Sequence, residues 1–192
     1  MNMTDLLVEL IVAGCGAAIW ILLLLSTLFD LDWAALLPDQ AGSFLVLIPS
    51  LSVVYVLGIV WDRAADRLFG VWDKPLRWEK FEDDAGYHRA RTYVSAYGTE
   101  EIINLFKYHR HRLRICRAWT VNLALLAITI PLVAWVRQSS APVAVTGFLG
   151  CGLLAGACWG TWRRLAANDY QRLAESHGFL VTERGGESGP PD

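Results

Sequence analysis

The stretch that decides the fold is Leu6–Phe29, LLVELIVAGCGAAIWILLLLSTLF, in which Glu9 is the one charged residue. About twenty apolar residues in a helix cross the roughly 30 Å hydrocarbon core of a bilayer. Further runs of similar length follow at about 41–61, 118–136 and 142–162. Because 54% of the residues are hydrophobic and the charges gather between these runs, we predict an all-α polytopic membrane protein with four transmembrane helices.

Charge between the runs predicts how the chain is oriented. The segment 62–117 contains twelve of the seventeen Lys and Arg residues, whereas the first connection, 30–40, contains three Asp and no Lys or Arg. Lys and Arg beside membrane spans are retained on the cytoplasmic side. We therefore expect 62–117 to be a cytosolic helical insert between two transmembrane hairpins, 1–61 and 118–162. Both termini would then be cytoplasmic.

Local signals predict where the cytosolic helices begin and end. The helix of the second span should continue to Phe69 and stop before Gly70. Thr99 is a suitable N-cap for a helix that continues into the third span. The tail 163–181 should be helical up to Gly178, a suitable C′ residue. The Gly- and Pro-rich end, 182–192, is expected to be disordered.

Two patterns predict helix packing. Gly152, Gly156 and Gly160 recur every four residues in the fourth span, a spacing that lets two helix backbones approach closely. This face could associate with a second copy, giving a homo-oligomer, or pack within the chain against the small residues of the first span. Apolar residues at steps of four and three before the third span form a seam suited to a neighbouring helix, and it includes Ile102, Phe106 and Leu113.

A basic stripe runs along the same helix, at steps of three, four and three: Lys107, Arg110, Arg114 and Arg117. Such a stripe could bind anionic lipid or an acidic partner, or anchor the chain at the inner leaflet. The segment 71–97 interleaves aromatic and basic residues, which suits the headgroup region of a lipid bilayer. The same composition leaves open the binding of RNA or a nucleotide signal.

The candidate polar site consists of Glu9, Asp62, Asp66 and Asn122. Glu9 is either a functional carboxylate within the bilayer or a residue at the headgroup level. Asp62 and Asp66 lie one helical turn apart, so they could hold a divalent metal or take part in ion pairs. Asn122 could hydrogen-bond another helix or line a wet pore. The four cysteines form no CxxC pair, and we expect no metal site and no cofactor.

The stretches WDRAADRLF at 61–69 and HRLRICR at 111–117, together with the order of spans, insert and helical tail, resemble small four-span membrane proteins encoded beside bacterial anti-phage systems. These families include accessory proteins of type VI CRISPR loci and of RADAR defence islands. The resemblance implies a role at the inner membrane during phage infection, through oligomerisation, depolarisation or sensing, with a cytosolic defence protein as a partner.

Two functions remain open on the sequence. The first is a non-enzymatic, oligomeric membrane effector or accessory protein that perturbs the membrane, forms a pore or acts as a scaffold. The alternative is a lipid-modifying metalloenzyme at the inner leaflet that uses Asp62 and Asp66, with His88, His109 and His111 as further acid–base or metal residues.

Overall fold

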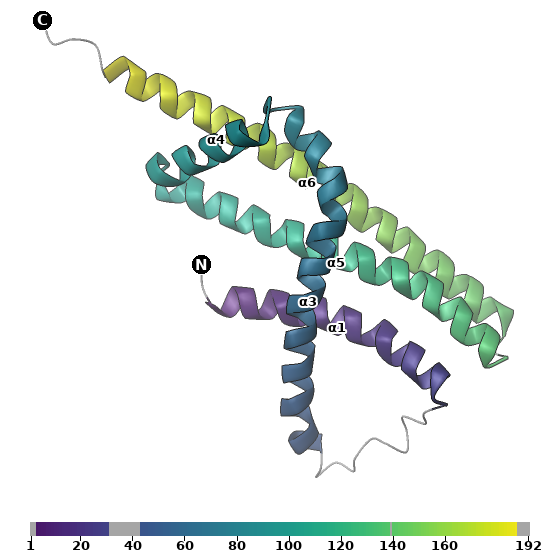
Figure 1. The fold of residues 1–192 in the computed structure, drawn as a ribbon. Helices are drawn as coiled ribbons and strands as arrows, with labels where there is room; N and C mark the ends of the chain where they lie inside the picture. Colours follow the sequence, from purple (N-terminus) through teal and green to yellow (C-terminus); the bar gives the residue numbers. More distant parts are fainter. Residues whose placement is uncertain (1–2, 31–42, 139, 188–192) are drawn as a thin grey trace, which may run out of the picture. The chain divides into compact units, whose positions relative to one another are not determined.

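The computed structural model describes residues 3–30, 43–138 and 140–187, and every regular element in these ranges is a helix. In chain order the helices are α1 (Met3–Leu28), α3 (Ser43–Trp78), α4 (Asp84–Tyr97), α5 (Glu100–Val136) and α6 (Ala141–Glu187), as Figure 1 shows. Four of them, α1, α3, α5 and α6, are long and apolar enough to cross a membrane. The all-helical class and the four helices of transmembrane length and composition are therefore confirmed.

The chain divides into two compact units, and three of the helices contribute to both. Unit 1 comprises Met1–Arg67 and Arg114–Gly160, and unit 2 comprises Leu68–Leu113 and Thr161–Asp192. Unit 1 holds the apolar runs, whereas unit 2 holds α4 and the polar ends of α3, α5 and α6. Polar and apolar stretches of a single helix thus belong to different units.

In unit 1, α1 and α3 pack backbone against backbone. A Cβ atom added to Gly14 would lie 1.9 Å from the carbonyl oxygen of Val54, and one added to Gly58 would lie 1.9 Å from that of Leu10. Such close approach is possible only where small residues face each other. Gly14 and Gly58 thus mark the point at which α1 crosses α3, as Figure 1 shows.

The helices α1 and α5 run in the same direction within unit 1. Towards the N-terminal end of α1 a guanidinium nitrogen of Arg114 lies 3.8 Å from a carboxylate oxygen of Glu9. At their other ends Arg137 Nη2 donates a hydrogen bond of 2.9 Å to the carbonyl oxygen of Ser26. First and third spans must share a direction in any chain that crosses a membrane repeatedly, so these contacts agree with the four-span order.

The core of unit 2 joins α4 to α5 and to the C-terminal part of α6. Its buried residues are Val94, Leu173 and Leu180, surrounded by partly buried Phe81, Tyr87, Tyr93, Ile102 and Phe106. A second contact pairs the buried rings of Phe69 and Trp162 edge to face, with centroids 4.6 Å apart. Burial of these rings and aliphatic side chains stabilises the unit.

Two predicted helix ends are wrong, and in both cases the helix continues past a glycine. Helix α3 extends through Gly70 to Trp78, and α6 extends through Gly178 to Glu187. Beyond these glycines Leu76 and Leu180 are buried, so packing offsets the roughly 1 kcal/mol that a glycine costs inside a helix. The expected disorder of 182–192 is accordingly wrong for 182–187, and 188–192 lie outside the described residues.

The predicted start of α5 agrees with the structure. The hydroxyl of Thr99 accepts a hydrogen bond of 3.5 Å from the backbone nitrogen of Ile102, and the helix then continues to Val136 with Pro131 inside it. The acidic connection at 31–40 and the expected first residues of the second span, 41–42, lie outside the described residues.

Candidate functional site

Two of the predicted polar residues are buried in unit 1 and bonded there. Glu9 is 4% exposed and is paired with Arg114, so its charge is balanced within the chain. Asn122 is fully buried; its amide nitrogen donates to the carbonyl oxygen of Ala13 at 3.1 Å, and its amide oxygen accepts from Trp20 Nε1 at 3.3 Å. Both residues therefore join α5 to α1, and Asn122 does not line a pore within the chain.

The carboxylate of Asp66 forms an ion pair within unit 1. A guanidinium nitrogen of Arg117 lies 2.5 Å from Asp66 Oδ1 and connects α3 to α5. Asp62, one turn earlier, is half-buried. Within the ranges that the structure describes, no three His, Cys, Asp or Glu side chains gather closely enough to hold a metal ion. The geometry thus favours the ion-pair interpretation of this carboxylate pair.

The basic stripe serves mainly to bind carboxylates of the chain itself. Arg114 and Arg117 pair with Glu9 and Asp66, and Arg110 lies near enough to Asp169 to influence its pKa. Lys107 is exposed. The stripe is accordingly divided between the two units, and three of its four members have acidic neighbours inside the chain.

The seam of apolar residues packs within unit 2. Ile102 and Phe106 contact the core of Val94, Leu173 and Leu180, while Leu113 is half-buried at the end of the unit. The role of Ile102 and Phe106 is therefore internal packing.

The glycine face of α6, defined as Gly152, Gly156 and Gly160, is uncovered. Apart from the adjacent residues and backbone of α6 itself, no described atom lies within 4 Å of where a Cβ would stand at any of the three positions. The small residues of α1 pack elsewhere, Gly14 against α3 and Gly16 against the side chain of Asn122. The interpretation that this face packs against the first span is therefore wrong for the described part of the chain.

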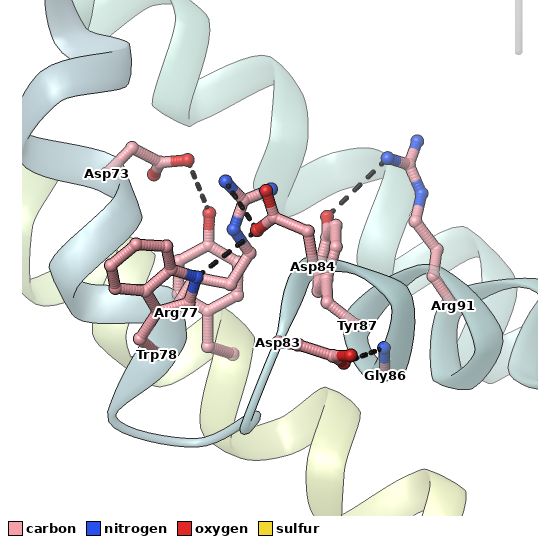
Figure 2. A network of polar contacts seen from close by, with 9 residues as sticks. Asp73, Arg77, Trp78, Asp83, Asp84, Gly86, Tyr87 and Arg91 are labelled. Carbon is pink, nitrogen blue, oxygen red and sulfur yellow. Dashed lines mark hydrogen bonds and ion pairs between the residues drawn. The ribbon is translucent and has the colours of Figure 1, made fainter.

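A polar and aromatic network in unit 2 was not predicted from the sequence. Figure 2 shows Arg77 and Trp78 of α3 facing Asp84 of α4, with Tyr87 of α4 nearby. Asp84 Oδ1 accepts a hydrogen bond of 3.3 Å from Trp78 Nε1 and lies 3.3 Å from Arg77 Nη2. The guanidinium carbon of Arg77 stands 5.0 Å from the centre of the Tyr87 ring, within cation–π range. These contacts fix the turn between α3 and α4.

The same network continues to α6 and along α4. Tyr170 donates a hydrogen bond of 2.7 Å to Asp73 Oδ2, and its ring packs edge to face on Tyr87 at 5.7 Å. Burial and the neighbouring Asp73 carboxylate raise the pKa of Tyr170, which keeps its hydroxyl protonated as a donor. Arg91 reaches the hydroxyl of Tyr87 at 3.5 Å, and Asp83 caps α4 by accepting from the backbone nitrogen of Gly86 (Figure 2).

Asp169 is the most perturbed carboxyl of unit 2. Burial raises its pKa to about 6, and the nearby guanidinium groups of Arg110, Arg172 and Arg91 only partly oppose that shift. Close by, Arg172 Nη1 lies 3.1 Å from His109 Nε2, and burial together with Arg172 lowers the pKa of His109. A neutral imidazole can accept a hydrogen bond from the guanidinium, so the lowered pKa of His109 agrees with its contact to Arg172.

Two of the three histidines of the enzyme hypothesis have contacts within unit 2. His109 meets Arg172, and His88 packs its ring on Tyr87. Sequence patterns could not reveal the contact of Asp73 with Tyr170, because the two residues are 97 positions apart and neither belongs to a recognisable motif.

Comparisons of the chain with models of protein families, with curated proteins and with solved structures find no match.

Proposed function

We propose that this protein is a non-enzymatic membrane protein that associates with copies of itself through the glycine face of α6. In this proposal it resides in the bacterial inner membrane, with unit 2 and both termini on the cytoplasmic side. The excess of Lys and Arg in 62–117 supports that orientation. The parallel contact of α1 with α5 supports the order of four spans.

The observation that carries the proposal is the difference between covered and uncovered glycines. Gly14, Gly16, Gly58 and Gly147 all lie against backbone or side chains of unit 1, whereas the glycine face of α6 meets nothing. Of the 18-residue apolar stretch of α6, only 6% is buried, whereas 28% of the corresponding stretch is buried in α1 and 33% in α5. Exposed leucine is ordinary for a helix in lipid, but three aligned glycines offer lipid no side chains to contact.

A second copy of α6 is the occupant that fits this face best. The GxxxG spacing is self-complementary, since each helix presents the same groove of small residues to the other. The neighbouring side chains Leu149, Leu153 and Phe148 are 54%, 76% and 51% exposed and would pack beside the groove. Repetition of such contacts would build an oligomer that perturbs the membrane, forms a pore or acts as a scaffold.

The resemblance of 61–69 and 111–117 to membrane proteins of anti-phage loci supports a role as an effector or accessory protein of such a system. Self-association would then be the step that produces its effect on the membrane. Cells that carry the protein with its neighbouring genes should resist phage infection, and the plating efficiency of the phage would measure that resistance.

The test compares Gly152→Leu/Gly156→Leu with Gly150→Leu. Gly150 is equally uncovered, but two residues correspond to about 200° around a helix, so it lies on another face. We expect the double variant to run as a monomer in mass measurements of the detergent-solubilised protein, while Gly150→Leu keeps the wild-type mass. A voltage-sensitive dye should report depolarisation in cells with wild-type protein and not with the double variant. An unchanged mass and potential in the double variant would reject the proposal.

A further inference from the structure

Unit 2 carries a groove that has no part in the function proposed above. An open depression of about 710 Å³ is lined by one face of α4 and by two residues of α6: His88, Arg89, Thr92, Tyr93, Ala96, Tyr97, His177 and Val181. A second depression of about 450 Å³ shares Arg89 and His177 with the first, so the two adjoin.

One end of the groove is basic. Arg89 and His177 stand where the two depressions meet, with His88 beside them and Lys80 in the second depression. The first depression has no carboxylate in its lining, and within the described residues no carboxylate pairs with Arg89. The second depression does include Glu82 and Asp83, but Asp83 is engaged as the N-cap of α4. A guanidinium without an acidic partner suits a phosphate group, which it can bind through two parallel hydrogen bonds.

The other end of the groove is aromatic. The ring of Tyr93 lies between two others, 4.8 Å from that of Tyr97 and 5.4 Å from that of His177. Tyr97 is 47% exposed although it is a large ring, and the small side chain of Ala96 leaves space beside it. Exposed rings beside a cationic groove are the arrangement on which nucleic-acid bases stack.

From this pairing of a basic end with an aromatic end we propose that the groove binds a nucleoside phosphate. The phosphate lies at Arg89 and His177, and the base lies against Tyr97 and Tyr93. Flat rings, rather than a track of long aliphatic side chains, form the apolar end, so a base fits it better than the acyl chain of an anionic lipid. All the lining residues belong to unit 2, and the proposal does not depend on self-association through α6.

The test measures binding of radiolabelled AMP, GMP, CMP and UMP to the full chain in detergent by equilibrium dialysis. Arg89→Met should weaken binding of the preferred nucleotide about tenfold or more, because a hydrogen-bonded charge pair is lost. Tyr97→Ala should weaken it about tenfold through loss of stacking. The matched controls are Arg164→Met and Tyr108→Ala, exposed residues of unit 2 outside the groove, and both should bind as wild type does.

Further ligands separate the parts of the proposal. The unlabelled nucleoside and inorganic phosphate should each compete at least about tenfold less well than the nucleotide, because each fills only one end of the groove. The proposal is overturned if none of the four nucleotides binds saturably, or if Arg89→Met binds as Arg164→Met does. Competition by phosphate as strong as that by nucleotide would also overturn it. Binding of dihexanoyl phosphatidic acid at Arg89, with no nucleotide binding, would instead assign the groove to lipid.

The variant Gly152→Leu/Gly156→Leu distinguishes this inference from the proposed function. We expect it to bind the nucleotide with wild-type affinity while it remains a monomer, because the groove and the glycine face share no residue. Loss of nucleotide binding in that variant would contradict the independence of the two sites.

Discussion

Gly58, like Gly14, is a position where one methyl group should perturb unit 1 strongly. It faces α1 at the crossing with α3, and a Cβ atom there would stand 1.9 Å from the carbonyl oxygen of Leu10 and 2.7 Å from its carbonyl carbon. Both atoms belong to the backbone, so no rotation of a side chain can make room. In Gly58→Ala the two helices must therefore move apart.

The size of the effect follows from that distance. Contacts of Cβ atoms closer than 3.0 Å are essentially absent from proteins, so α1 and α3 must separate locally by at least about 1 Å. Overpacking of this kind costs about 1–3 kcal/mol. Alanine favours a helix over glycine by about 1 kcal/mol, which offsets part of the cost. We expect Gly58→Ala to lower the free energy of unfolding by about 1–2 kcal/mol.

The matched control is Gly156→Ala, the same substitution in another apolar helix. Apart from the adjacent residues and backbone of α6 itself, no described atom lies within 4 Å of the added methyl group, so only the helix propensity acts, and this variant should be unchanged or slightly stabilised. Unfolding in mixed micelles of mild detergent and SDS, followed by far-UV circular dichroism, would measure both free energies. A protein concentration at which the wild type is monomeric keeps association out of the comparison.

The opposite order of stability would refute the reasoning. If Gly58→Ala were as stable as the wild type while Gly156→Ala were destabilised, the close crossing of α1 and α3 would not exist in the folded protein.

Asn122→Leu should lower the free energy of unfolding by about 1–2 kcal/mol, because the buried amide bonds both Ala13 and Trp20; Asn104→Leu, exposed on the same helix, is the control. An equal loss in both variants, again read from SDS unfolding, would contradict this. For Asp169, whose pKa is raised to about 6, the folded state binds the proton more tightly than the unfolded state does. Stability should therefore fall by about 1–2 kcal/mol as the pH rises from 4 to 6.5, and Asp169→Asn should abolish that fall in thermal unfolding measured across this range; persistence of the fall would assign it to other groups.

The sequence by itself determined the features that depend on local properties of the chain. The length and apolar character of Leu6–Phe29 and the three later runs predicted helices that can cross a membrane, because the bilayer thickness sets a minimum length. The start of α5 after Thr99 was predicted for a similar reason, since an N-cap acts on backbone groups only a few residues away.

Tertiary structure decided the features that depend on contacts between distant residues. The continuation of α3 past Gly70 and of α6 past Gly178 follows from burial of Leu76 and Leu180, which outweighs the local preference of glycine. Whether a glycine is covered, as Gly58 is, or uncovered, as Gly156 is, has no signature in the sequence around it.

The polar contacts follow the same division. Asn122 is a recognisable polar residue in an apolar run, but its acceptor on Ala13 is 109 residues away in the chain. Asp73 and Tyr170 read in the sequence as an ordinary carboxylate and an ordinary ring, and only the packing of α3 beside α6 in unit 2 makes them partners. The apolar pattern determined which segments are helical, because helix formation and bilayer crossing are local. The arrangement in space determined which helix faces are filled, because each such contact needs two segments at once.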